Sequence, residues 1–439
     1  MKEKLILSWL YLFFILTSPV WAQKSGHNWA KIYSQELFRI TEVMVTDVAS
    51  PPVAARIYSY STLGAYVTVL DSNPDLRFKD FLAFGNFPKP DFPFLETEIQ
   101  SHEFAAVYAM FLVGEKIMPS GYLLKEAKEN WIKKGLKEKI ISKKNLDTHL
   151  QLAQKAADFV LDLARKDGYI QLTALTRYTP KEGEGFWFPT PPAYMAAVEP
   201  EWRTMKTFYL QNLEDFKPSA MAPFDLNEGS SFQIQLQEVY QVGKSLTEEQ
   251  KLIANFWDCN PFKVEFSGHM AIGVKKISPG GHWIGITGIA SEKANLSFAE
   301  TAYIHALIGT TLHDAFVSCW KAKYDTNRIR PETVIHQKLD SDWKPLLQTP
   351  PFPEYTSGHS VISSASAEIL TGYFGDSFDF VDSSEVYFGL PERAFSSFYQ
   401  AAEEASISRL YGGIHFRDAI ENGVAQGKKI GKTIWDRLD

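Results

Sequence analysis

Residues 353–359 read Pro353-Glu354-Tyr355-Thr356-Ser357-Gly358-His359, and an apolar run compatible with a helix follows from Ser360 to Leu370. The first amides of a helix have no partner within it and carry partial positive charge. A Ser-Gly-His step at that point can therefore hold an oxyanion and protonate it. Taken alone, the same residues are also explained by an ordinary N-cap, with Ser357 capping the helix and His359 on the surface. The sequence on either side decides between these interpretations.

Most of the chain is patterned for helices. Apolar residues recur at helical spacing in many segments, whereas the period-2 alternation of strands is scarce. Capping boxes at 247–250 and 297–300 open two further helices. The predicted helices are residues 28–48, 53–70, 99–117, 123–141, 145–166, 250–257, 297–323, 394–410 and 415–438. We therefore predict an all-α fold with the helices packed as two bundles.

The predicted organisation has three parts. Residues 1–22 form a signal peptide, 23–232 an N-terminal helical region, and 233–439 a catalytic helical bundle, with the irregular stretch 216–232 before the boundary. A second irregular stretch, 183–200, is rich in Pro and aromatic residues, and we interpret it as a packed connector rather than a wall of a substrate site. The Gly-rich segment 278–283 is predicted to be a loop, with His282 on the surface or facing a site.

The N-terminus has the features of a targeting segment. Lys2 and Lys4 supply positive charge, residues 5–16 are apolar, and Val20-Trp21-Ala22 offers a small-residue cleavage site before Gln23. The apolar run is shorter than the roughly 20 residues that span a bilayer. We therefore predict an exported protein, periplasmic or secreted, with no transmembrane segment after cleavage.

Composition excludes some function classes. The formal net charge of −7 argues against a nucleic-acid surface, so an anion site needs local basic residues. Cys259 and Cys319 are the only cysteines, and a chain of this size does not need a disulfide to fold. The default interpretation is two buried free thiols.

Two further clusters carry basic residues and a second imidazole. Lys323 and Arg330 lie seven residues apart, so a continuous helix would present them on one face near its C-terminus. Arg409 ends one predicted helix before Gly412-Gly413, and His415 begins the next. In isolation, each cluster is explained by a solvated helix end or a cap.

Together the three clusters meet the needs of a tetrahedral polyanion. Three cations, one hydroxyl and one backbone amide can surround its oxygens, and planar guanidinium groups grip oxygens in pairs. Two separate histidines can divide the labour, one binding the central atom and the other moving protons at the opposite oxygen. The residues are Lys323, Arg330, Ser357, Gly358, His359, Arg409 and His415.

The order Lys-x6-Arg-Pro, Ser-Gly-His and Ser-Arg-x5-His resembles the signature of the vanadium-dependent haloperoxidases and of the related type 2 phosphatidic acid phosphatases and bacterial acid phosphatases. Lys323–Pro331, Thr356–His359 and Ser408–His415 carry it over roughly the last quarter of the chain. Trp320, Phe352 and the segment 187–192 resemble the haloperoxidase branch. A three-part match is far more specific than one short motif.

The resemblance implies a vanadate cofactor bonded to His415. It implies that Lys323, Arg330, Ser357, Gly358 and Arg409 hydrogen-bond the equatorial oxygens, while His359 assists proton transfer as hydrogen peroxide arrives. Lys323 would polarise the peroxide that the halide attacks, with Trp320 and Phe352 in the halide pocket. The expected activity is oxidation of iodide or bromide by hydrogen peroxide to a hypohalous species, with small organic acceptors as further substrates.

The alternative is an exported acid phosphatase, acting on phosphomonoesters or lipids. It would use the same residues without vanadate, with His415 as nucleophile and His359 protonating the leaving alcohol. Two positions depart from the family pattern: Thr356 replaces a proline, and Asp418 lies three residues after His415 where an acid often lies four residues on. The sequence therefore assigns Asp418 no role in orienting His415.

Overall fold

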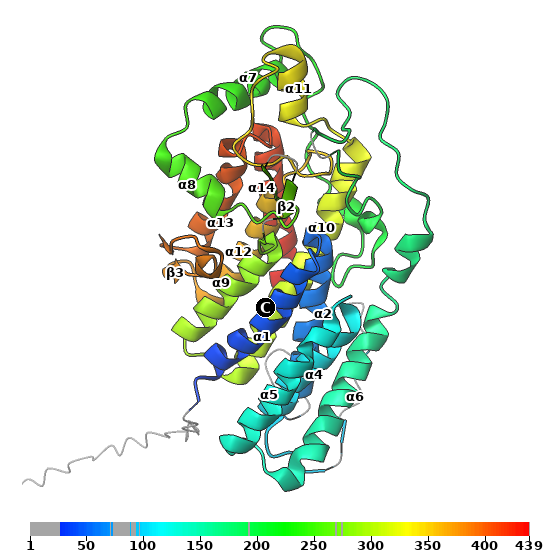
Figure 1. Cartoon of the computed structure of the whole chain (residues 1–439), viewed down its shortest axis with the longest axis vertical. Helices are drawn as coiled ribbons and strands as arrows, with labels where there is room; N and C mark the ends of the chain where they lie inside the picture. The colour runs from blue at the N-terminus through cyan, green and yellow to red at the C-terminus, as the bar shows by residue number, and fades with distance from the viewer. Residues whose placement is uncertain are drawn as a thin grey trace, which may run out of the picture.

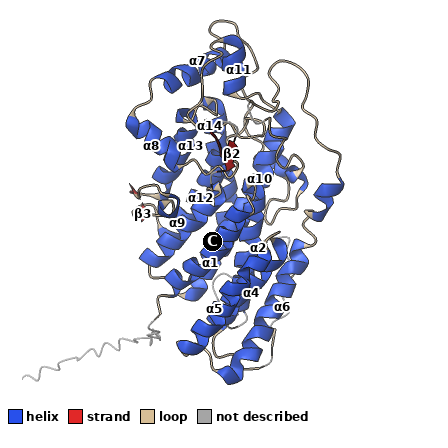
Figure 2. Ribbon diagram, in the orientation of Figure 1, coloured by secondary structure: helices blue, strands red, loops and turns tan. Residues whose placement is uncertain are grey.

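The protein is described by a computed structural model that covers residues 27–70, 72, 88, 94–95, 97–191, 194–267, 270–273 and 275–438. The predicted signal peptide lies outside the described residues. Among these residues helices dominate, and strands are confined to short hairpins (Figure 2). The prediction of an all-α fold is confirmed.

The helices and strands follow one another along the chain as Figure 1 labels them. The α-helices are α1 (Trp29–Thr46), α2 (Pro51–Leu70), α4 (His102–Ile117), α5 (Leu124–Lys137), α6 (Leu146–Ala164), α7 (Ser231–Lys244), α8 (Glu248–Phe256), α9 (Pro279–Lys293), α10 (Phe298–Thr326), α11 (Pro331–Lys338), α12 (Gly358–Phe374), α13 (Phe398–Tyr411) and α14 (Arg417–Trp435). The antiparallel hairpins pair β1 (Val264–Ser267) with β2 (Met270–Gly273) and β3 (Phe380–Asp382) with β4 (Arg393–Phe395). Short 3-10 helices cover Gly121–Leu123, Lys143–Asn145, Ile170–Ala174, Trp202–Thr204, Leu213–Phe216 and Val386–Phe388.

Helix α10 connects the two ends of the molecule. The helices α4, α5 and α6 gather at one end and α7, α8 and α11 toward the other, with α10 between them (Figure 1). A capping box of Ser297 and Glu300 begins α10, and nearly all of its residues are buried. It packs along α2, which is buried all round, as expected of a helix that is apolar on every side.

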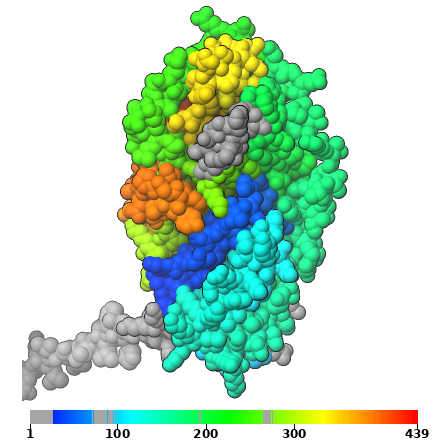
Figure 3. Space-filling view, viewed as in Figure 1, coloured from blue at the N-terminus to red at the C-terminus, as the bar shows by residue number. Residues whose placement is uncertain are grey.

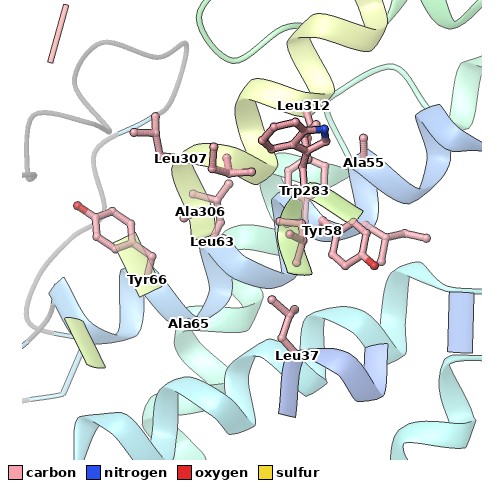
Figure 4. Packing of buried hydrophobic residues seen from close by; sticks show 14 of the residues in the cluster. Leu37, Ala55, Tyr58, Leu63, Ala65, Tyr66, Trp283, Ala306, Leu307 and Leu312 are labelled. Atoms are coloured by element: carbon pink, nitrogen blue, oxygen red, sulfur yellow. The ribbon is translucent and has the colours of Figure 1, made fainter. Parts of the chain in front are cut away.

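The crossing of α2 and α10 is close because small residues meet there. The Ser59 hydroxyl donates to the Gly309 carbonyl at 2.7 Å, and a Cβ on Gly309 would lie 3.1 Å from the Ser59 Cα. Apolar residues of both helices surround the contact, among them Leu63 of α2 and Leu307 of α10 (Figure 4). One buried cluster runs from α1 to α14 across the predicted boundary at residue 232, and the division into 23–232 and 233–439 stays a prediction.

Helices α12 and α14 approach each other through glycines. Gly423, Gly427 and Gly431 are four residues apart, so they share one face of α14. A Cβ on Gly427 would lie 2.1 Å from the Val361 carbonyl oxygen, and one on Gly431 would lie 2.6 Å from that of Ala365. This contact brings α14 against the N-terminal half of α12, where the Ser-Gly-His step lies.

Several predicted boundaries were wrong. Helix α10 ends at Thr326 because Asn327 adopts a left-handed conformation with φ 52°, so Lys323 and Arg330 do not share a helix face. Pro331 begins α11 instead of only ending a helix, as its fixed φ allows. The helix predicted over 394–410 begins only at Phe398, because residues 394 and 395 belong to β4, and α14 begins at Arg417 rather than at His415.

The segment 278–283 was also predicted wrongly. Ser278 caps α9, Pro279 stands at its first turn, and His282 is fully buried in a helix rather than in a surface loop. The two glycines beside His282 lower the helix propensity of this segment, and tertiary packing outweighs that low propensity.

Among the described residues, no helix is long and apolar enough to cross a membrane.

Residues 183–191 of the connector pack behind the Asn327–Arg330 turn. The Trp187 amide donates to the Asn327 carbonyl at 2.7 Å, and the Ile329 amide donates to the Gly185 carbonyl at 2.9 Å. Trp187 is 1% exposed, as the packed-connector interpretation requires, whereas Tyr194 is 63% exposed. The connector therefore supports the turn that carries Arg330.

The helix contact at Gly427 yields the first prediction. Gly427→Ala adds a methyl group that backbone on α12 cannot accommodate, so the free energy of unfolding falls by about 1–3 kcal/mol or more. Gly273→Ala is the control, because a Cβ there meets no atom within 4 Å. Denaturant unfolding of both variants measures the change, and equal stability of the two would contradict the contact.

Candidate active site

The sequence-predicted residues converge from five helix ends. Lys323 lies in the last turn of α10, Arg330 caps α11, and Ser357 caps α12. Arg409 lies in the last turn of α13, and His415 lies in the turn before α14. A cavity of about 40 Å³ lies beside them, lined by Gly358, His359, Arg409, His415, Trp320 and Phe352 with residues of neighbouring loops. That volume is on the order of three water molecules, which suits a small inorganic group.

Three of the converging residues are buried cations without a carboxylate partner. Lys323, Arg330 and Arg409 are at most 2% exposed. Within the described part of the chain they hydrogen-bond backbone carbonyls, His415 and Ser408, and none of them bonds a carboxylate. An unpaired buried charge costs several kcal/mol, so the arrangement calls for an anion.

The pKa values of these three cations reflect the free-energy cost of burying their charges. Burial lowers the pKa of Lys323 to about 7, and it lowers the pKa of Arg330 and that of Arg409 to about 10 each. The Nη2 atom of Arg330 is buried without a hydrogen-bond partner. An anion beside these groups would stabilise their charged forms and accept the donor that is left over.

His415 is oriented by Glu354. Its Nδ1 lies 2.8 Å from Glu354 Oε1, and this oxygen also accepts the Phe416 amide at 3.0 Å. The second carboxylate oxygen of Glu354 faces Arg328 at 3.3 Å. A proton on Nδ1 leaves the lone pair of His415 on Nε2, as in histidine ligands that donate their other nitrogen to a carboxylate.

The Nε2 atom of His415 already touches a cation. Arg330 Nη1 lies 3.2 Å from it. Burial, Arg330 and Lys323 hold the pKa of His415 well below its usual value, so the imidazole is neutral and able to donate a lone pair. The ligand atom and its neighbouring guanidinium are therefore ready for one negatively charged group.

His359, the second histidine of the site, has one ring nitrogen bonded and the other free. Its ring bonds the Trp257 carbonyl, and its Nε2 atom is buried without a partner. Burial, Arg409 and His415 hold the pKa of His359 well below its usual value. A neutral imidazole with a free Nε2 lone pair on the cavity wall can accept a proton from a group that enters the cavity.

Lys323 and Ser357 lie behind the cavity wall. Lys323 Nζ donates to the carbonyls of Pro353, Glu354 and Thr356 at 3.1, 3.0 and 2.5 Å, which uses its three hydrogens. The geometry therefore presents Lys323 as a buried charge, and its predicted bond to an oxyanion stays a prediction. Ser357 Oγ accepts from Ser360 N and Oγ, so the predicted N-cap is present and the Ser357 hydrogen is available.

Aromatic rings close one side of the site. The Trp320 and Phe352 rings lie 5.0 Å apart, both line the cavity, and Phe352 lies 5.1 Å from both Lys323 Nζ and Arg330 Cζ. An apolar face beside the cations excludes water and strengthens their field. The predicted halide-pocket residues are thus next to the cavity.

Sequence reasoning missed Glu354 and Arg328. Both stand inside the quoted motifs, and an acid three residues before Ser357 of the Ser-Gly-His step was the available signal. Asp418, which the sequence left without a role toward His415, bonds Arg328 and the Ala222 amide. No local sequence signal marks the Trp257 carbonyl, which also accepts Arg409 Nη2 at 2.7 Å.

Known proteins share the fold of this chain. The family model "VCPO second helical-bundle domain" matches residues 303–439. The crystal structure of "the first bacterial vanadium dependant iodoperoxidase" is 39% identical, with a TM-score of 0.84 over 93% of this chain and 97% of that one. A comparison with curated sequences finds no match.

Two structures of a bacterial vanadium-dependent chloroperoxidase share the fold. The holo form is 13% identical, with a TM-score of 0.66 over 89% of this chain and 92% of that one. The apo form is 14% identical, with a TM-score of 0.65 over 88% and 93%.

Glu354 provides the second prediction. Glu354→Gln keeps the shape but weakens the orientation of His415, so vanadate affinity falls by about 10–100-fold, as for other partners of ligand histidines. Asp167→Asn is the matched variant, because Asp167 is a buried carboxylate that bonds Arg56 and no residue of the site. Equilibrium dialysis with vanadium measurement reads both affinities, and an equal loss in the two variants would refute the role of Glu354.

Proposed function

The chain belongs to the vanadium-dependent haloperoxidase family, and we propose that it oxidises iodide with hydrogen peroxide at the cavity between His359 and His415. The relative that is 39% identical is an iodoperoxidase, which supports iodide as the halide. Bromide is the second candidate, and chloride, the hardest of the three to oxidise, is the least favoured. The observation that carries the proposal is the trio of buried cations without carboxylate partners beside an oriented His415.

The residues present fit a vanadate ion. A tetrahedral oxyanion would neutralise Lys323, Arg330 and Arg409, and Arg330 Nη2 would gain the acceptor it lacks. His415 Nε2 would supply the nitrogen ligand, Ser357 a hydroxyl, and Gly358 the amide of a helix N-terminus. Vanadate held by these residues would supply the activation of hydrogen peroxide toward attack by a halide.

His415 and Glu354 act as a unit in this proposal. The carboxylate keeps the proton on Nδ1 and so keeps the Nε2 lone pair directed to the oxyanion. Arg328 pairs with Glu354 and Asp418, which holds the carboxylate in place. The nitrogen ligand is thereby oriented before any anion arrives.

His359 is proposed to handle protons. Its bond to the Trp257 carbonyl leaves Nε2 free, and this atom can take a proton from hydrogen peroxide as the peroxide enters. The same nitrogen can return the proton to an oxygen that leaves as water or hydroxide. The low pKa of His359 keeps it in the accepting form at neutral pH.

Trp320 and Phe352 are proposed to shape the halide site. Iodide is large, polarizable and weakly hydrated, so an apolar aromatic wall beside buried cations suits it better than a polar wall would. Small organic acceptors are proposed as further substrates, which the hypohalous product would halogenate.

The phosphatase alternative is not favoured. Its chemistry would use the same histidines, with His415 as nucleophile. The similarity that spans nearly the whole chain is to a haloperoxidase. A phosphate-ester assay accompanies the peroxidase assay as a direct comparison.

Export is proposed from the N-terminal sequence alone. A charged start, an apolar run and the Val20-Trp21-Ala22 site support cleavage before Gln23 and delivery to a periplasm or the outside. N-terminal sequencing of the protein from its native cells is expected to begin at Gln23. An intact Met1 on the mature protein would contradict export by this route.

The activity is tested on apo-protein with hydrogen peroxide and iodide, bromide or chloride, with and without vanadate. We expect vanadate-dependent oxidation, fastest with iodide, because the oriented His415 and the buried cations bind the oxyanion. His415→Ala is expected to lose activity and bound vanadium together. Full activity without vanadate, or ester hydrolysis that vanadate inhibits, would overturn the proposal.

The division between the histidines is tested in the same assay. His359→Ala is expected to retain vanadium while turnover falls by about 10²–10⁴-fold, the usual contribution of a positioned proton-transfer group. His27→Ala is the control, because His27 pairs with Glu138 far from the cavity residues in sequence and fold. An unchanged rate in His359→Ala would show that another group moves the proton.

A further inference from the structure

A compact set of metal-ligating side chains lies beside the cavity and has no part in the proposed reaction. Cys259 follows α8, His282 lies in the first turn of α9, and Glu385 precedes the 3-10 helix Val386–Phe388. The three residues are 2%, 0% and 1% exposed. Figures 1 and 3 show the segment that carries Glu385 next to α8, so three distant parts of the chain meet here.

The three ligand atoms form a nearly equilateral triangle. Cys259 Sγ lies 3.3 Å from His282 Nδ1 and 3.7 Å from Glu385 Oε1, and His282 Nδ1 lies 3.2 Å from Glu385 Oε1. A tetrahedral zinc ion, with bonds of about 2.3 Å to sulfur and about 2.0–2.1 Å to nitrogen and oxygen, holds such atoms about 3.3–3.6 Å apart. The three observed distances between the ligand atoms match that spacing.

Hydrogen bonds can also join these atoms, because the Cys259 thiol and a protonated His282 Nδ1 can both donate to Glu385 Oε1. A cation at the centre would displace these hydrogens and use one lone pair from each of the three atoms.

Asp382 completes the arrangement from outside. Its Oδ2 lies 2.7 Å from His282 Nε2, the ring nitrogen that does not face the triangle, and its Oδ1 accepts the Ser384 amide and hydroxyl. A carboxylate on the far nitrogen fixes the tautomer of a metal-binding histidine and raises its basicity. The Trp257 ring stacks on His282 at 4.4 Å and fixes its plane.

We propose that Cys259, His282 and Glu385 bind a divalent ion of the zinc class, with Asp382 as the partner that positions His282. A thiolate with an imidazole selects zinc-like ions over Mg²⁺ or Ca²⁺, which prefer oxygen ligands. The described residues provide no fourth Cys, His, Asp or Glu ligand in the group, so water takes the remaining tetrahedral position.

The ion would stabilise one wall of the cavity. Cys259 lines the cavity, and its amide donates to the Trp257 carbonyl at 2.9 Å. The same carbonyl accepts Arg409 Nη2 and the His359 ring. Zinc bound at Cys259 therefore holds the turn that positions His359 and Arg409, without taking part in the vanadate chemistry.

The test measures metal in the untagged full chain after exposure to zinc chloride and desalting. Elemental mass spectrometry is expected to find about one zinc ion per chain. Cys259→Ser is expected to lose nearly all of it, whereas Cys319→Ser, which removes the other buried thiol, keeps it. Asp382→Asn is expected to weaken zinc affinity by about 10–100-fold.

A second measurement guards against variants that fail to fold. Cobalt(II) bound to the wild-type chain is expected to show a thiolate-to-cobalt charge-transfer band, and Glu385→Gln to alter it while Cys319→Ser does not. Trace zinc in the wild type, equal zinc in Cys259→Ser, or a metal-free Cys259 oxidised to sulfenic or sulfinic acid would each overturn the proposal. These measurements use no peroxide or halide, so their outcome is independent of the haloperoxidase assay.

Discussion

The structure depends on burying three cations to which no carboxylate of the described residues hydrogen-bonds. Lys323, Arg330 and Arg409 lie at helix ends and give their hydrogens mainly to backbone carbonyls. Such carbonyls stabilise a cation partly, but they do not cancel its charge. The fold therefore carries a positive cavity whose cost is offset when an oxyanion binds. The helix packing, the aromatic wall and the two histidines are arranged around that requirement.

Close helix contacts deliver the groups to the cavity. The glycine face of α14 lets it approach α12, so the turn with His415 meets the helix start with Ser357, Gly358 and His359. Glu354 then joins the two motifs, because it precedes the Ser-Gly-His step and bonds both His415 and the Phe416 amide. A single carboxylate thus determines the tautomer of the ligand histidine and the position of the α14 start.

The opposite wall rests on the turn after α8. The Trp257 carbonyl holds Arg409 and His359, and Cys259 follows it by two residues. A metal ion at Cys259, His282 and Glu385 would connect this turn to α9 and to the segment after β3. The two histidines of the active site would then be held by different means, one by a carboxylate and the other by a backbone carbonyl whose turn a metal ion stabilises. That difference suits a ligand that must stay fixed and a proton carrier that must exchange protons.

The sequence by itself determined the helical class, because apolar spacing and capping boxes are local signals that tertiary packing here reinforces. It also predicted the candidate site residues, because short motifs place hydroxyl, amide, guanidinium and imidazole groups at fixed offsets, and the structure brings these motifs to neighbouring helix ends. Only the tertiary structure decided that Lys323 and Arg330 lie on different helices, since Asn327 turns the chain between them. Only it joined Glu354 to His415 and Cys259 to His282 and Glu385, because contacts between residues far apart in the chain depend on how whole helices pack.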